Sequence, residues 1–198
     1  MAYAKKILTF IFSAFLIIPT LLAAVNGDHS YVEDACSVTR YRDLCIHSLA
    51  SFSSTAKNSP SRWARAGVSV TLGETKNVAR YLVYLKKHSN RMKGKSGVAL
   101  SDCIECFENA IDELHKSLGV LRKLSRTTFA TQMGDLNTWL SAALTDGDTC
   151  LDGFEEVQRG KQIKSLQNRV LRATRFTSNA LALANKLAAT GLRSLPDP

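Results

Sequence analysis

Apolar residues recur at every third or fourth position through much of the chain, which is the spacing of one face of an α-helix. One stripe spans residues 100–121 and consists of Leu100, Ile104, Phe107, Ile111, Leu114, Leu118 and Leu121. A second spans residues 129–157 and consists of Phe129, Met133, Leu136, Leu140, Ala143, Gly147, Cys150, Phe154 and Val157. We therefore expect two long helices, the second running through Asp146 and Gly147 as far as Val157.

Two further helices are expected on either side of this pair. Residues 60–87 open with Ser59 as N-cap and Pro60 at the first helical position, and residues 162–187 carry another apolar stripe. Proline is absent between Pro60 and Pro196, and no two-residue alternation typical of strands occurs. The links between the helices are short, which favours antiparallel neighbours over a coiled coil. The fold predicted for residues 58–190 is an all-α, up-down-up-down four-helix bundle.

The N-terminus has the pattern of a secretory signal peptide. Lys5 and Lys6 precede an apolar run from Ile7 to Leu22, and small residues follow at Ala23 and Ala24. A membrane anchor is the alternative, but the run barely reaches the roughly 20 apolar residues of a spanning helix, and no second run follows. We expect a signal peptide over residues 1–27, a secreted domain over 28–198, and no membrane association after cleavage.

All five cysteines lie after the predicted cleavage site, so two disulfides and one free thiol are expected in an oxidising compartment. Cys36 and Cys45 are nine residues apart, and a bridge between them would staple a helical hairpin over residues 28–57. If the second and third bundle helices reverse near Arg126, Cys103 lies 23 residues before the turn and Cys150 lies 24 after it.

The heights of the cysteines along the two helices decide the second bridge. The mismatch with Cys150 is about 1.5 Å for Cys103 and about 6 Å for Cys106, near the limit for a disulfide. We therefore predict Cys103–Cys150 and leave Cys106 unpaired, available for dimerisation. A redox role for Cys103 and Cys106 would need a preceding strand, and a zinc site would need a second ligand pair; the sequence has neither. Without a recognisable catalytic motif as well, we expect no enzyme, metal or cofactor.

Charge is unevenly distributed along the chain. The formal net charge of +9 falls to +7 without Lys5 and Lys6, which favours weak association with acidic polysaccharide, while secretion makes nucleic acid an unlikely partner. Ten of the seventeen acidic residues flank the predicted Cys103–Cys150 bridge: Asp102, Glu105, Glu108, Asp112, Glu113, Asp146, Asp148, Asp152, Glu155 and Glu156. Each alone is typical of a solvated helix surface, but together they indicate a binding surface for a basic partner at one end of the bundle.

Several motifs are similar to those of a known family. They are Cys36, Thr39, Tyr41 and Cys45 in "CSVTRYRDLC", Asp102 and Cys103, "AIDEL" at 110–114, "TWLSAALTDGDTCLDGF" at 138–154 and "SNALAL" at 178–183. Over its whole predicted mature length the chain resembles the plant invertase and pectin methylesterase inhibitors. Arg42 departs from the pattern, since many members have proline there.

The resemblance implies a four-helix bundle with an N-terminal helical hairpin and the same two disulfides. It also implies a protein of the apoplast and cell wall that forms a one-to-one complex with its target enzyme and covers the substrate cleft. By position within the motifs, the residues expected in or near that contact are Glu105, Asn109, Asp112, Asp148 and Thr149. Asn109 is uncharged where some relatives carry an acidic residue.

Pectin methylesterase is the target favoured by the resemblance. Invertase inhibitors commonly carry a late Pro-Lys-Phe motif, which this chain lacks, and "LSAALTDGDTCLDGF" is more similar to the pectin methylesterase inhibitors. An inhibitor of acid invertase, whether of the cell wall or the vacuole, is the alternative. A third possibility is a secreted helical carrier of an apolar ligand. The same fold precedes some pectin methylesterases as a pro-region, but the chain ends soon after the fourth helix, so a free inhibitor is expected.

Overall fold

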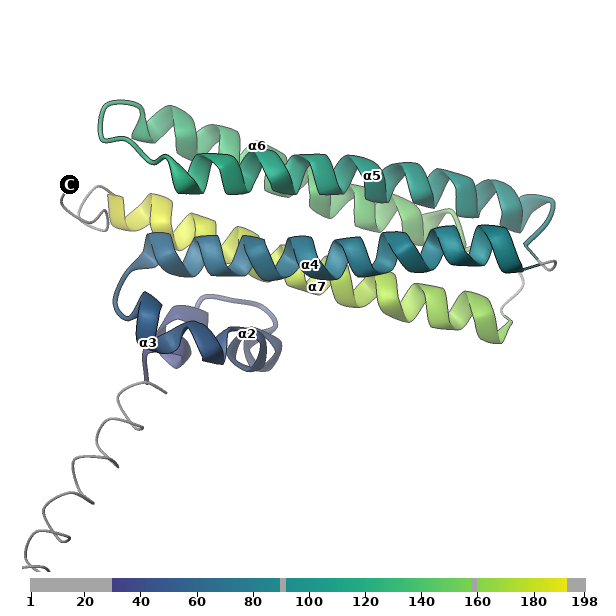
Figure 1. Ribbon diagram of the computed structural model, residues 1–198, viewed down its shortest axis with the longest axis horizontal. Coiled ribbons are helices and arrows are strands. Elements are labelled where there is room, and N and C mark those ends of the chain that lie inside the picture. The colour runs from purple at the N-terminus through teal and green to yellow at the C-terminus, as the bar shows by residue number, and fades with distance from the viewer. Residues whose placement is uncertain (1–29, 90–91, 158–159, 192–198) are drawn as a thin grey trace, which may run out of the picture.

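Four long helices form the body of the protein in the computed structural model, which describes residues 30–89, 92–157 and 160–191 (Figure 1). They are α4 (Pro60–His88), α5 (Lys95–Arg122), α6 (Phe129–Asp152) and α7 (Lys161–Thr190). Each packs against two neighbours, α5 against α4 and α6, and α7 against α4 and α6. Across the described ranges there is no strand. The predicted up-down-up-down bundle is therefore confirmed, while the predicted signal peptide lies outside the described residues.

Local sequence sets the helix ends. At the start of α4 the Ser59 hydroxyl accepts a hydrogen bond from the Arg62 N–H at 3.4 Å, and Pro60 occupies the first position, as predicted. Gly191 ends α7 with a φ of 63°, a left-handed conformation that glycine adopts without steric cost. These bounds agree with the expected ones to within a few residues.

The predicted end of the third bundle helix at Val157 is wrong, because α6 stops at Asp152. Beyond it, the N–H of Phe154 bonds to the carbonyl of Leu151 at 3.0 Å, and the N–H of Glu155 bonds to the carbonyl of Asp152 at 3.0 Å. These are three-residue turns that satisfy the last carbonyls of the helix, next to Gly153, which has low helix propensity. The tighter turns still leave Phe154 fully buried, so the apolar pattern continues after the helix has ended.

A hairpin over residues 30–56 packs beside the bundle (Figure 1). It consists of a helical segment over 30–36, α2 (Arg42–Leu49), the 3₁₀ turn η1 (Ala50–Phe52) and α3 (Ser53–Ala56). Cys36 and Cys45 form a disulfide with a Cα–Cα distance of 5.8 Å, the pairing that the sequence predicts. The bridge joins the helical segment to α2 and so fixes the shape of the hairpin.

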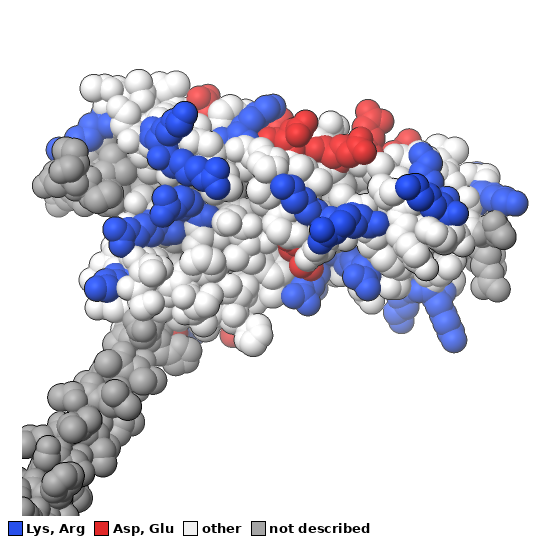
Figure 2. Space-filling model, viewed as in Figure 1, with Lys and Arg blue, Asp and Glu red and all other residues white. Residues whose placement is uncertain are grey.

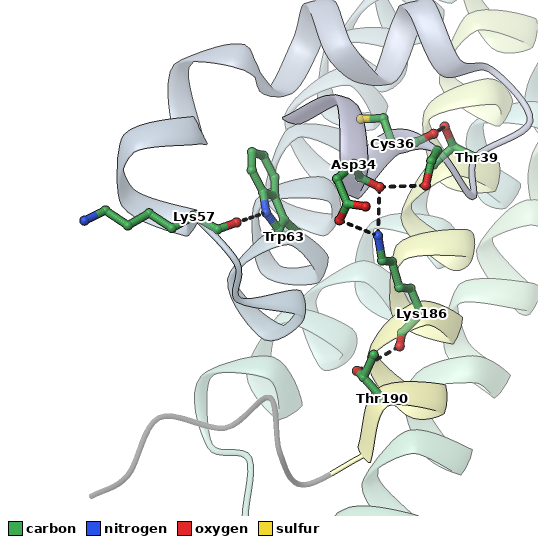
Figure 3. A network of polar contacts seen from close by, with 8 residues as sticks. Asp34, Cys36, Thr39, Lys57, Trp63, Lys186 and Thr190 are labelled. Atoms are coloured by element: carbon green, nitrogen blue, oxygen red, sulfur yellow. Dashed lines mark hydrogen bonds and ion pairs between the residues drawn. The ribbon is translucent and has the colours of Figure 1, made fainter. Parts of the chain in front are cut away.

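Polar contacts attach the hairpin to α7. Asn179, only 4% exposed, accepts a hydrogen bond from the Tyr41 N–H at 3.1 Å and donates one to the Tyr41 carbonyl at 2.9 Å. Figure 3 shows Lys186 of α7 donating to the Asp34 carbonyl at 2.7 Å and pairing with the Asp34 carboxylate at 3.0 Å. In the same view the indole N–H of buried Trp63 donates to the Lys57 carbonyl at 2.7 Å. Satisfying both backbone groups of Tyr41 avoids the cost of burying them unpaired.

Close packing of α6 on α7 depends on Gly147. A Cβ placed there would lie 2.6 Å from the Thr174 Oγ1 atom and 3.6 Å from its Cβ. We expect Gly147→Ala to lower the free energy of unfolding by about 1 kcal/mol, because overpacking outweighs the gain in helix propensity. Adding Thr174→Ala removes the clashing oxygen, so the double variant should recover the stability of Thr174→Ala alone. Urea unfolding measures both; a stabilising Gly147→Ala would contradict this packing.

Candidate interaction face on α5 and α6

Charge divides the bundle into two halves. Helices α4 and α7 carry twelve lysines and arginines and a single carboxylate, that of Glu74. Helices α5 and α6 carry nine carboxylates and three lysines or arginines, all three of them on α5. Figure 2 shows part of this pattern as a band of acidic side chains along the upper edge, where Figure 1 places α5. Opposite charges are thus concentrated on opposite helix pairs.

We call the exposed carboxylates of α5 and α6 around the bridge the acidic face. Its members are Asp102, Glu105, Glu108, Asp112, Asp148 and Asp152. They lie around the bridge because α5 and α6 are antiparallel, so the first half of α5 runs beside the last half of α6. The predicted grouping of these residues around the bridge is what the structure shows.

A disulfide fixes the register of α5 against α6. Cys103 and Cys150 are both buried and are joined with a Cα–Cα distance of 4.4 Å. This is the pairing that helix height predicts, and it leaves Cys106 as the free cysteine. The bridge lies under the acidic face and holds its two helices at a fixed spacing.

The five predicted contact residues are all exposed, three on α5 and two on α6. Their directions follow from the turn of about 100° per residue. Thr149 projects toward α5, like Asp146 three residues earlier, and Asn109 lies on the side of α5 that faces α6. The three therefore border the seam between the two helices.

Asp148 points the other way. It is eleven residues after Asn137, almost a whole number of turns, and Asn137 donates a hydrogen bond to Asn185 of α7 at 3.3 Å. Asp148 therefore lies on the α7 side of α6. Glu105 and Asp112 occupy the outer surface of α5. Asn109 and Thr149 thus both border the α5–α6 seam, Glu105 and Asp112 lie on the outer surface of α5, and Asp148 lies apart from these four.

Two half-buried carboxylates lie along the α5–α6 seam, Asp146 on α6 and Glu113 on α5. Burial raises the pKa of Asp146, and the charge of Glu113 on α5 raises it further. Glu113 pairs through one oxygen with Lys116 at 3.1 Å, while its other oxygen is buried and has no hydrogen-bond partner among the described residues. Burial and the charge of Glu113 therefore both disfavour the ionised form of Asp146.

The pair predicts a pH-dependent stability. Since the folded protein holds the Asp146 proton more tightly than the unfolded chain, stability should fall as pH rises through the raised pKa and recover in acid. We expect Asp146→Asn to raise the free energy of unfolding by about 0.5 kcal/mol at neutral pH, a small gain because solvent screens the pair. The gain should vanish near about pH 4. Thermal melts at several pH values, with Asp135→Asn as control, test this; a pH-independent gain would contradict it.

Cys106 is half-buried in the same region. Burial raises the pKa of its thiol, and the nearby carboxylates of Asp146, Glu105 and Asp102 raise it further. A thiol that resists ionisation is a slow nucleophile. The availability of Cys106 for dimerisation stays a prediction, and the environment favours slow formation of such a dimer.

We expect the Cys106 thiol of the native protein to react with iodoacetamide at least about tenfold more slowly than in the protein unfolded in urea with its disulfides intact. In the folded state the fraction of thiolate is lower and the reagent reaches the sulfur less easily. Mass spectrometry of the labelled chain gives the rate. A Cys106→Ser variant identifies the site, and equal rates in the folded and unfolded states would show that the thiol is freely reactive.

The fold and its two disulfides define the class of protein, an all-α bundle with a disulfide-bridged N-terminal hairpin. Comparisons with known proteins identify the family within this class. The family model for plant invertase/pectin methylesterase inhibitors matches residues 30–183. Pectinesterase inhibitor 6 of Arabidopsis thaliana is 49% identical over 164 residues, covering 82% of this chain and 78% of the relative. The 21 kDa protein of Daucus carota is 34% identical over 185 residues, covering 91% of this chain and 95% of the relative.

A solved structure supports the same fold. The crystal structure of a mutant form of a pectin methylesterase inhibitor from Arabidopsis superposes with a TM-score of 0.62 at 21% identity, covering 77% of this chain and 93% of that one. The chain belongs to the plant invertase/pectin methylesterase inhibitor family. None of the helices in the described ranges is long and apolar enough to cross a membrane.

Proposed function

We propose that the protein is a secreted inhibitor of pectin methylesterase that acts in the apoplast and has no catalytic activity of its own. The support is its family and its 49% identity to an Arabidopsis protein named as a pectinesterase inhibitor. The N-terminal sequence pattern supports secretion.

The inhibitor is proposed to form a one-to-one complex with the enzyme through α5 and α6. The observation that carries this is the concentration of exposed carboxylates on one rigid helix pair whose register a disulfide holds. Such a surface needs little ordering on binding and steers a partner with basic residues around its cleft. Glu105, Asn109, Asp112 and Thr149 are proposed to make contact, with Asp148 at the margin.

The helix pair is large enough for this role. The 24 residues of α6 extend about 36 Å, and two packed helices are roughly 20 Å wide. The resulting surface approaches the roughly 800 Å² per partner of a standard protein interface. An elongated ridge of this size can lie along an extended substrate cleft and exclude a polymeric substrate from it.

Acid invertase is the alternative target, and a parallel assay separates the two. Purified protein is added at micromolar concentration to a plant pectin methylesterase, followed by methanol release, and to a cell-wall invertase, followed by release of glucose. Inhibition of the methylesterase alone is the expected result. Inhibition of invertase alone would transfer the proposal to that enzyme. The carrier alternative requires an apolar ligand, which mass spectrometry of an organic extract would detect.

A further inference from the structure

A groove lined with basic side chains runs along α7 to the N-terminal hairpin. Two adjoining hollows share Asn168 and Arg172 and together form what we call the basic groove. Its cations on α7 are Lys161, Lys164, Arg169, Arg172 and Arg175, and the hairpin adds Arg40 and Arg42. Figure 2 shows basic side chains along the lower right edge, where Figure 1 places the first half of α7.

Among the described residues, few carboxylates lie close enough to neutralise this charge. The carboxylates lining the groove are those of Glu74 and Asp43. Glu74 pairs with Arg172 at 3.1 Å, whereas within the part of the chain that the structure describes, Arg169 and Arg175 have no carboxylate at ion-pair distance. Five more cations than carboxylates therefore line one open groove, which produces a strongly positive local potential.

Aromatic rings hold several of the guanidinium groups in place. Arg169 lies over the Tyr81 ring with 4.3 Å between the guanidinium carbon and the ring centroid. Arg175 and Arg40 lie on the Tyr41 ring at 5.3 Å and 5.6 Å. Stacked arginines lose less side-chain freedom on binding an anion than free ones do. The backbone of Tyr41 is itself fixed by Asn179, so the hairpin side of the groove is anchored to α7.

The groove and the acidic face lie on different helices. The groove follows α7 and the hairpin, whereas the acidic face belongs mainly to α5, and α7 packs against α4 and α6 as its bundle neighbours. The lining of the groove comes from α7, the hairpin and Glu74 of α4, so an enzyme seated across the α5–α6 seam would leave the groove open. A second ligand can bind there at the same time.

We propose that the basic groove binds a stretch of acidic polysaccharide, a polyuronate that carries free carboxylates along a linear chain. Planar guanidinium groups match carboxylates in geometry and charge. The groove is open and elongated, which suits a segment of polymer more than a small molecule. The choice of polyuronate among polyanions rests on the proposed function, because hydrolysis of pectin methyl esters leaves free carboxylates on the polymer where the target enzyme works.

Binding to immobilised polygalacturonate tests the proposal, with highly methyl-esterified pectin and polyphosphate as competing ligands. The groove variant is Arg169→Gln/Arg175→Gln, and the matched control is Arg122→Gln/Lys123→Gln, which removes the same charge from exposed positions at the far end of α5. We expect roughly tenfold weaker binding for the groove variant, unchanged binding for the control, and loss of wild-type binding at high salt.

Equal binding by the two variants would overturn the proposal, because net charge alone would then explain retention. Equal affinity for esterified pectin, or preference for polyphosphate, would overturn the choice of polyuronate. If the groove variant fails to fold by circular dichroism, Lys161→Gln/Lys164→Gln in the exposed first turn of α7 replaces it. Inhibition of pectin methylesterase is measured in parallel and should be the same for all variants. A failed prediction of polysaccharide binding is therefore distinguishable from a failed prediction of enzyme inhibition.

Discussion

Thr149→Trp is expected to weaken inhibition of pectin methylesterase by about 100-fold, which corresponds to about 2.7 kcal/mol of binding free energy. Thr149 is exposed beside the α5–α6 seam and directly precedes the bridged Cys150. Because the backbone there is held rigidly, an indole ring cannot be accommodated by a local shift and should keep the enzyme at a distance. Inhibition curves from methanol release give the change in affinity.

The helix offers a matched control in Thr131→Trp. Thr131 is also exposed on α6 and lies eighteen residues earlier, which is five whole turns, so it points in the same direction about 27 Å away. This variant should inhibit like the wild type, with the same helical content. Equal loss of inhibition in both variants, or full inhibition by Thr149→Trp, would move the contact away from the acidic face.

Replacing both Cys103 and Cys150 with serine should cause the largest loss of stability. The bridge closes a loop with a sequence separation of 47, for which chain entropy gives a stabilisation of about 4 kcal/mol. The hairpin bridge, with a separation of nine, gives about 2.7 kcal/mol by the same relation. Denaturant unfolding without reductant should therefore show a larger loss for the Cys103/Cys150 variant than for the Cys36/Cys45 variant. The opposite order would show that the Cys36–Cys45 bridge contributes more to the free energy of unfolding than the Cys103–Cys150 bridge.

Much of the fold is predictable because each helix carries its own periodic signal. The stripe from Leu100 to Leu121 identifies α5, and most of its members are buried. The end of α6 is not predictable in this way, since Phe154 is buried whether the chain continues as a helix or tightens into turns. The bridge between Cys103 and Cys150 follows from the rise per residue once the two antiparallel helices are taken to reverse near Arg126.

The candidate site is less predictable, because the rotation of one helix against another depends on packing. Spacing along α6 cannot reveal that Asp148 lies toward α7 while Thr149 lies toward α5. It also cannot reveal that the charge of Glu113 on α5 raises the pKa of Asp146 on α6. The basic groove depends on docking of the hairpin through Asn179, which appears in the sequence only as a polar residue within an apolar stripe. Such a residue is the signal that could have located the docking site.

Stoichiometric titration of a pectin methylesterase tests the central claim most directly. Enzyme is held well above the dissociation constant, wild-type protein is added in steps, and methanol release from pectin is recorded at each step. The expected result is a linear fall that reaches its end point at one inhibitor per enzyme, and a higher apparent inhibition constant as pectin concentration rises. Undiminished methanol release at micromolar protein would contradict it.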